Sequence, residues 1–168
     1  MTTPPADPVR VFRDTIGRFP TGVAIVTSIG PDGPAGMTTN AVTSLSLDPL
    51  LIIVCFEARS RTLDVVRATR RFGVNVLRAD DEALATVFAS KRVGPEKFEA
   101  LTDRRWRKEH GVPVLDRAVA WIACELRELL PGGDHEIGIG AVAGTGTGTG
   151  TDSDPLVFHR GRYTTTLG

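Results

Sequence analysis

One uninterrupted apolar run, residues 50–56 (LLIIVCF), constrains the fold more than any other part of this sequence. A continuous run of this kind is typical of a strand that is buried on both faces. No apolar run in the chain is longer, and at seven residues it is far shorter than the roughly 18 residues of a membrane-spanning helix. The run therefore predicts a buried β-strand, and the sequence predicts no membrane segment.

Other β-prone runs lie on both sides of this strand. The segment 36–46 (GMTTNAVTSLS) is rich in small hydroxyl residues, which indicates a strand, a kink and a second strand. The 18 glycines and 11 prolines mark many turns, and therefore many strands. Further strands are expected at residues 22–28, 72–77, 118–126, 135–142 and 155–160.

Short helices are expected at residues 8–18, 60–70 and 81–90. Apolar residues recur at helical spacing in the first segment, and Ser60 can cap the second. Residues 91–117 are expected to be irregular, with Phe98 and Trp106 as anchors, and the Gly-Thr repeats at 144–151 to form a flexible hairpin or loop tip. Because helices and strands do not alternate, the sequence argues against a doubly wound parallel sheet. A mainly β fold, a small antiparallel barrel with flanking helices, fits better.

Composition limits the class of protein. The 168 residues fit one domain at 8–168, and residues 1–7 are expected to be disordered. Lys+Arg and Asp+Glu both number 20, which argues against a nucleic-acid binder, and the first residues, MTTPPADPVR, have no apolar core, so no signal peptide is expected. Cys55 and Cys124 are expected to be reduced thiols of a cytoplasmic protein. The three histidines lack metal-ligand spacing, so no metal is expected.

One glycine motif resembles a dinucleotide fingerprint: Gly138, Gly140 and Ala143 form GxGxxA. That fingerprint must open a helix, but GTGTGTGT follows here and is a poor helix former. We therefore interpret these glycines as thinning a strand where another group packs against it. The sequence holds no P-loop and no nucleophile elbow.

Two polar segments are candidate binding sites. Hydroxyl and amide side chains between residues 38 and 46 suit a polar planar ring, although an exposed edge strand would carry the same residues. Arg59–Thr62 (RSRT) precedes a predicted helix, where free amides and arginines can bind an anion such as phosphate. The alternative is an ordinary Ser60 cap with solvated arginines.

Three further segments combine cations with aromatic or hydroxyl groups: 88–92 (FASKR), 133–135 (GDH) and 159–163 (HRGRY). A basic end of a helix also has a simple explanation in the helix dipole, and a histidine after Gly-Asp can merely stabilise a turn. The arginine clusters at residues 67–71 and 104–108 are interpreted as solvated faces.

Taken in order, these segments resemble the short-chain flavin reductase family, the reductase components of two-component flavin-dependent monooxygenases. The resemblance extends from about residue 10 to 165 and depends on FPTGV (19–23), GMTTNAVTSLSLDP (36–49), LLIIVC (50–55), SRT (60–62), FGVNVL (72–77), FASK (88–91), KF (97–98), GDH (133–135) and PLVFHRGRY (155–163). It implies a six-stranded antiparallel Greek-key split barrel of the FMN-binding type that works as a homodimer. It also implies an enzyme that uses NADH or NADPH to reduce FMN or FAD for a partner monooxygenase.

The resemblance also assigns roles to residues of this chain. Those implied to line the flavin ring and ribityl chain are Met37, Thr38, Thr39, Asn40, Ala41, Thr43 and Ser44. Ser60, Arg61 and Thr62 would hold its phosphate, and Phe88, Ser90 and Lys91 would close over it. His135 would contact the nicotinamide as the one catalytic candidate, with Arg160, Gly161 and Tyr163 near the dinucleotide. The family often has Ser where this chain has Ala41, so that contact would come from the backbone.

The choices between FMN and FAD and between NADH and NADPH stay open at this point. Two other functions on the same barrel also remain: an oxidase that retains FMN, and a flavin-binding module without catalytic activity.

Overall fold

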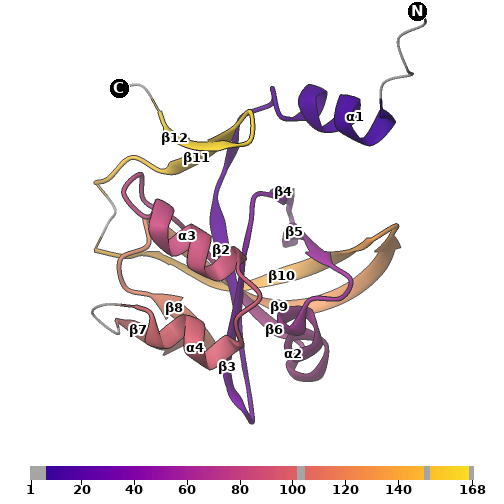
Figure 1. Ribbon diagram of the computed structural model, residues 1–168. Coiled ribbons are helices and arrows are strands. Elements are labelled where there is room, and N and C mark those ends of the chain that lie inside the picture. Colours follow the sequence, from indigo (N-terminus) through magenta and orange to yellow (C-terminus); the bar gives the residue numbers. More distant parts are fainter. Residues whose placement is uncertain (1–6, 102–104, 150–151, 167–168) are drawn as a thin grey trace, which may run out of the picture.

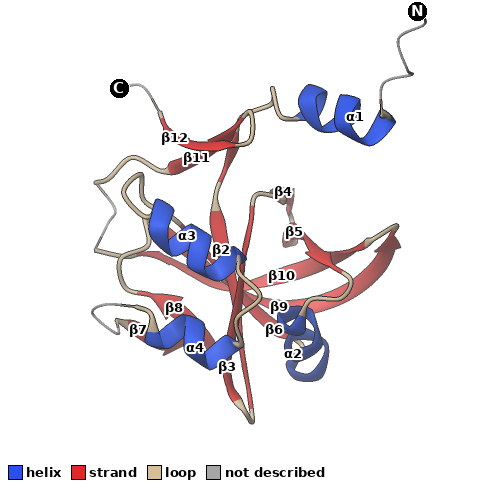
Figure 2. Ribbon diagram, in the orientation of Figure 1, coloured by secondary structure: helices blue, strands red, loops and turns tan. Residues whose placement is uncertain are grey.

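The structure is a computed structural model that describes residues 7–101, 105–149 and 152–166 (Figure 1). Strands dominate and helices flank them, which confirms the expected fold class (Figure 2). The helices are α1 (Pro8–Ile16), α2 (Arg61–Thr69), α3 (Glu82–Ala89) and α4 (Gly94–Glu99). The strands are β1 (Thr21–Gly22), β2 (Ala24–Gly30), β3 (Gly33–Thr39), β4 (Val42–Leu47), β5 (Leu50–Glu57), β6 (Arg71–Val76), β7 (Trp106–Glu109), β8 (Val112–Leu115), β9 (Ala120–Gly132), β10 (His135–Thr147), β11 (Leu156–His159) and β12 (Arg162–Thr165). None of the described helices is long and apolar enough to cross a membrane.

The main sheet has seven strands where the sequence predicts a barrel of six. Its order is β3-β2-β6-β9-β10-β5-β4, and every neighbouring pair is antiparallel. The edge strands β3 and β4 are consecutive in the chain, and only Asn40 and Ala41 separate them. Because two residues cannot span a flat seven-stranded sheet, the sheet curls until its edges meet at this corner. The predicted strand, kink and strand over 36–46 are confirmed.

Strand β5 has one fully buried face, so the prediction that both of its faces are buried is wrong. Ile52, Val54 and Phe56 are at most 6% exposed and belong to the main apolar core. The alternate residues Leu51, Ile53 and Cys55 are only half-buried. The other apolar face of β5 is therefore only partly covered within a single chain.

The first half of the Gly-Thr tract is an ordered strand rather than a loop tip. Residues 144–147 continue β10 and pair with residues 120–123 of β9. A Cβ at Gly144 would collide with the His110 ring, and one at Gly146 would lie 2.7 Å from the Trp121 ring. The alternating threonines point the other way and are exposed. The repeat thus places glycines where the rings of His110 and Trp121 pack. Residues 150–151 of the tract lie outside the described residues.

The glycines of the GxGxxA motif also leave room for packed aromatic rings, as the sequence analysis predicts. Both lie in β10, and no helix follows them. A Cβ at Gly138 would lie 2.7 Å from the Phe56 ring, and one at Gly140 would lie 2.9 Å from Cε1 of Phe72. The two rings are fully buried and meet edge to face at a centroid distance of 5.8 Å.

Residues 91–117 are more regular than expected, since they contain α4 and the hairpin of β7 and β8. Phe98 is 4% exposed, and its ring packs against Phe88 and Trp106, which confirms both predicted anchors. The arginines predicted as solvated are largely paired with carboxylates, among them Arg67 with Asp64 and Glu136. Arg104 lies outside the described residues.

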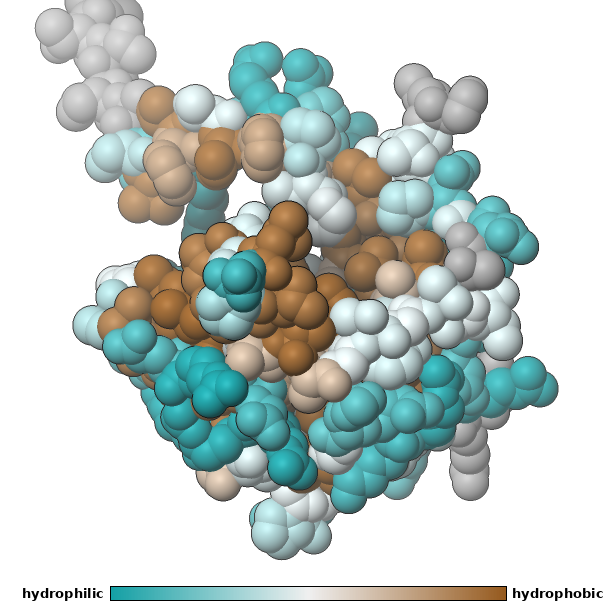
Figure 3. Space-filling model, turned by 180° about the vertical axis from the view of Figure 1, so that it is seen from behind, coloured by the Kyte–Doolittle hydropathy of each residue, from teal (hydrophilic) through white to brown (hydrophobic). Residues whose placement is uncertain are grey.

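Helix α1 projects from the body of the molecule (Figure 1). Its first turn is capped by the carboxylate of Asp7, which accepts a hydrogen bond of 3.1 Å from the Val9 amide; the other residues predicted to be disordered, 1–6, lie outside the described part. All its apolar side chains are exposed, with Phe12 at 66% and Ile16 at 52%. Figure 3 shows this apolar surface on α1 and more apolar surface on the body next to it.

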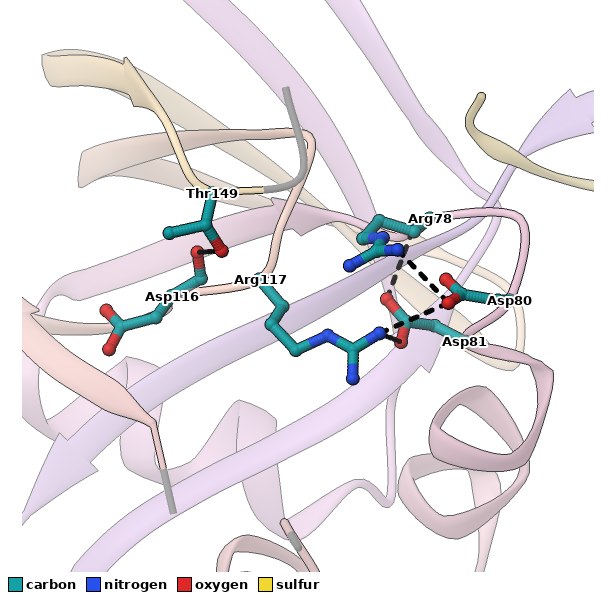
Figure 4. A network of polar contacts seen from close by, with 6 residues as sticks. All are labelled: Arg78, Asp80, Asp81, Asp116, Arg117 and Thr149. Atoms are coloured by element: carbon teal, nitrogen blue, oxygen red, sulfur yellow. Dashed lines mark hydrogen bonds and ion pairs between the residues drawn. The ribbon is translucent and has the colours of Figure 1, made fainter. Parts of the chain in front are cut away.

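A network of charged side chains fixes the start of α3 (Figure 4). Arg117 pairs with Asp80 at 3.2 Å and with Asp81 at 3.8 Å, and the Arg78 amide donates to the Asp81 carboxylate. Burial raises the pKa of Asp81, and the hydrogen bond from Arg78 opposes that rise. The network holds α3 in place, and the end of α3 carries three of the residues implied to contact flavin.

Candidate functional site

A cavity of about 560 Å³ opens at the corner where β3 meets β4. Its walls are mostly apolar and come from β2, β4, β5, β6 and β9, including Val74 and Ile122. Asn40, Ala41 and Thr43 of the predicted set line its polar side, together with Cys55 of the open β5 face. Its volume is within the range of pockets that hold small ligands and cofactors.

Several hydroxyls of the 37–44 segment are engaged within the protein. Thr38 donates to the Ala85 carbonyl at 2.6 Å, and Thr39 is buried and accepts from the Ala41 amide at 3.1 Å. Asn40 donates to the Thr21 hydroxyl at 3.1 Å. These bonds fix the corner, whereas the side chains of Thr43 and Ser44 are exposed.

The start of α2 has no side-chain cap. The Ser60 hydroxyl points instead to the sulfur of Met37, at 3.3 Å, so the first amides of the helix have no capping side chain. Arg61 is exposed, while Thr62 is 4% exposed and faces the core. The hydrogen bond between Ser60 and Met37 brings the predicted phosphate segment against the predicted ring segment.

The end of α3 carries Phe88, Ser90 and Lys91. The Phe88 ring is fully buried and fills the space beside Gly36, so its position is that of a core residue. Ser90 donates to the Val87 carbonyl at 2.6 Å, and Lys91 is exposed.

His135 lies beside the segment that leads into α2. It pairs with Glu57 in the sheet, and the Ala58 amide donates to the Asp134 carbonyl at 3.0 Å. The His135 ring is exposed, and its Nδ1 is 2.7 Å from the Asp134 carboxylate. This hydrogen bond lowers the pKa of Asp134 and fixes the ring. The turn that carries His135 therefore lies beside the residues that lead into the predicted phosphate segment.

Arg160, Gly161 and Tyr163 belong to a hairpin that the sequence analysis missed. Arg160 and Gly161 form its two-residue turn, both with positive φ (51° and 74°), as a type I′ turn requires. The Arg160 amide donates to the Gly17 carbonyl at 2.7 Å, and Tyr163 packs on Phe158. These contacts place the hairpin next to α1 and away from the His135 turn (Figure 1).

Comparison with known proteins decides the family. The model of the flavin reductase like domain matches residues 16–167 of this chain. The chain belongs to the flavin reductase family. It is 35% identical over 156 residues, 92% of this chain and 81% of the relative, to the flavin-dependent monooxygenase reductase subunit HsaB of Mycobacterium tuberculosis. It is 34% identical to an NADH-dependent flavin reductase of Rhodococcus sp, covering 90% of this chain and 83% of that protein.

Solved flavin reductases share the fold. The NADH:FAD oxidoreductase SgcE6 of Streptomyces globisporus, in complex with NAD and FAD fragments, has a TM-score of 0.83 and 33% identity, covering 97% of this chain and 94% of that one. Nitrilotriacetate monooxygenase component B from Mycobacterium thermoresistibile has a TM-score of 0.87 and 34% identity, covering 95% and 87%. The predicted family and enzyme class are confirmed.

The cavity walls contain functional candidates that sequence reasoning missed, among them Cys55, Val74, Val76 and Ile122. Nothing in their local sequence separates them from core residues. Phe19 and Thr21 also line the cavity, and the FPTG segment that contains them was a signal for these two.

Proposed function

We propose that this flavin reductase transfers a hydride from NADH or NADPH to FMN or FAD and releases the reduced flavin to a partner monooxygenase. The observation that carries the proposal is the convergence of three segments: the corner at Asn40 and Ala41, the uncapped start of α2, and the His135 turn. Two hydrogen bonds join them, from Ser60 to Met37 and from Ala58 to Asp134. Relatives that are named as reductase components of monooxygenases support the release step.

The residues present fit a flavin mononucleotide. The apolar cavity suits the flavin ring, with the backbone of Ala41 and the side chains of Asn40 and Thr43 at its polar edge. The uncapped amides of α2 and the Arg61 guanidinium suit the phosphate, because a helix start and an arginine both attract anions. Bound flavin supplies the electron chemistry, and the protein supplies binding and orientation.

Hydride transfer between two rings needs little acid–base chemistry, so we assign no catalytic triad. The protein must hold the nicotinamide carbon about 3–3.5 Å from the flavin nitrogen that accepts the hydride. We assign His135 to the nicotinamide, because Asp134 orients its exposed ring beside the phosphate segment. Ser90 and Lys91 would close the site from α3, and Arg160, Gly161 and Tyr163 would approach the dinucleotide from a second subunit.

We also propose a homodimer on a Greek-key split barrel. The apolar faces of α1 and β5 are unpartnered in the single chain, and Leu47 at the end of β4 and Leu50 at the start of β5 are 82% and 51% exposed. Exposed apolar surface of this kind is typical of an interaction face. A second copy would cover it and would bring its own 160–163 hairpin toward the His135 turn.

The test is NADH and NADPH oxidation by the purified protein, with FMN, FAD and riboflavin added in turn. We expect turnover that rises with added flavin. A protein that purifies yellow and oxidises no NAD(P)H would support an FMN-retaining oxidase instead. Flavin binding without any turnover would support a binding module.

A further inference from the structure

Lys97 of α4 is a buried cation that the proposed function leaves unused. It is 7% exposed, and its ammonium donates to the Gly36 carbonyl at 3.1 Å and to the Phe88 carbonyl at 2.9 Å. Among the residues that the structure describes, no carboxylate forms an ion pair with it. Burial of an ammonium without a counter-ion costs free energy, so the position of Lys97 calls for an explanation.

The two carbonyls belong to neighbouring elements, β3 and α3, that carry residues predicted to contact flavin. Gly36 directly precedes Met37 in β3, and Phe88 is in the last turn of α3, just before Ser90 and Lys91. Carbonyls in the last turn of a helix lack intrahelical partners and carry the negative end of its dipole, so an ammonium is well placed there. The Phe88 ring packs so closely on Gly36 that a Cβ there would lie 2.7 Å from it. Lys97 thereby locks α3 against β3.

Lys97 also adds charge to the phosphate segment. Its ammonium holds the Gly36 carbonyl, and the sulfur of the next residue, Met37, accepts from the Ser60 hydroxyl at the start of α2, at 3.3 Å. Burial lowers the pKa of Lys97, and repulsion by the positive charge of Arg61 lowers it further. A dianionic phosphate at the start of α2 would relieve this repulsion, whereas a neutral ligand would not. The ammonium has three donors, and the two carbonyls use only two of them.

We propose that Lys97 is a positioning residue that holds the end of α3 on β3 and, together with Arg61, selects flavins that carry a phosphate. This inference rests on the proposed flavin site and assigns a further residue to it. It predicts that the charge of Lys97 affects FMN more than riboflavin, because the two ligands differ only in the phosphate.

The experiment compares the dissociation constants of FMN and riboflavin, from quenching of flavin fluorescence, in the full-length protein. In Lys97→Met, which keeps an unbranched side chain one atom shorter but loses the charge, we expect the preference for FMN over riboflavin to fall roughly tenfold. Lys97→Arg should restore most of the preference. If Lys97→Met does not fold, Lys97→Gln keeps a hydrogen-bond donor and allows the same comparison.

Two controls separate charge from packing. Phe98→Leu loosens the same helix without changing charge, and Lys108→Met removes an exposed lysine; both should keep the wild-type preference. Equal weakening of both flavins by Lys97→Met, or an unchanged preference, would overturn the role of Lys97 while leaving the proposed function intact. A wild-type protein that binds riboflavin as tightly as FMN would overturn the phosphate site itself, and with it this inference.

Discussion

Gly140→Ala tests whether the glycine motif of β10 exists for packing. A Cβ at this position would lie 2.9 Å from Cε1 of Phe72, nearer still to its Cζ, and 3.0 Å from Cβ of Cys124. The Phe72 ring cannot move aside easily, because it is fully buried and meets Phe56 edge to face. Overpacking of this kind costs about 1–3 kcal/mol, and the lower entropy of the unfolded alanine chain offsets about 0.4–1 kcal/mol of that.

The net loss of unfolding free energy should therefore be about 1–2 kcal/mol, which corresponds to a fall in Tm of about 2–8 °C for a chain of this size. Calorimetry and denaturant unfolding measure it. Gly22→Ala is the matched control for stability, because a Cβ there meets nothing within 4 Å and φ is not positive. The KM for NADH, measured well below Tm, should stay at the wild-type value. An unchanged Tm with a strongly raised KM would refute the packing argument and favour a nucleotide-binding motif.

Three other outcomes follow from the site. Arg61→Ala should weaken FMN and FAD about tenfold in titrations but barely affect riboflavin, since it removes a charge-assisted contact to phosphate; equal losses for all three flavins would argue against that contact. His135→Ala should raise the KM for NADH more than it weakens flavin binding, and unchanged NADH kinetics would reject its role. Burial raises the pKa of the Cys124 thiol to about 12. At pH 8 a thiol reagent should therefore reach Cys124 only after unfolding; rapid labelling of Cys124 in the native state would contradict this.

The sequence determines the local elements and the family. Apolar patterning places α1 and most strands within a few residues, and residues suited to a helix start place α2 and α3, because both signals are local properties of one element. The order of nine short segments identifies the flavin reductase family although no single one of them is specific. The β7–β8 and β11–β12 hairpins were missed, although His110–Gly111 and Arg160–Gly161 carry the positive φ values of two-residue turns.

Tertiary structure decides what each element packs against. The composition of the Gly-Thr tract predicts a flexible segment. Gly144 and Gly146 instead occupy strand positions against His110 and Trp121, which lie more than twenty residues away in the chain. Similarly, Ser60 is suited to cap α2, but its hydroxyl contacts Met37 from another strand. The sequence predicts that Phe88 covers a ligand, but the fold buries its side chain completely.

The site itself is also a product of the fold. Local sequence supplies a helix start with an arginine, a hydroxyl-rich corner and a Gly-Asp-His turn, but their separations along the chain carry no information about distance in space. They converge because the seven-stranded sheet curls until β3 and β4 meet and because β10 pairs with β5. The sequence thus determines which chemical groups are available, and long-range strand pairing decides which of them become neighbours.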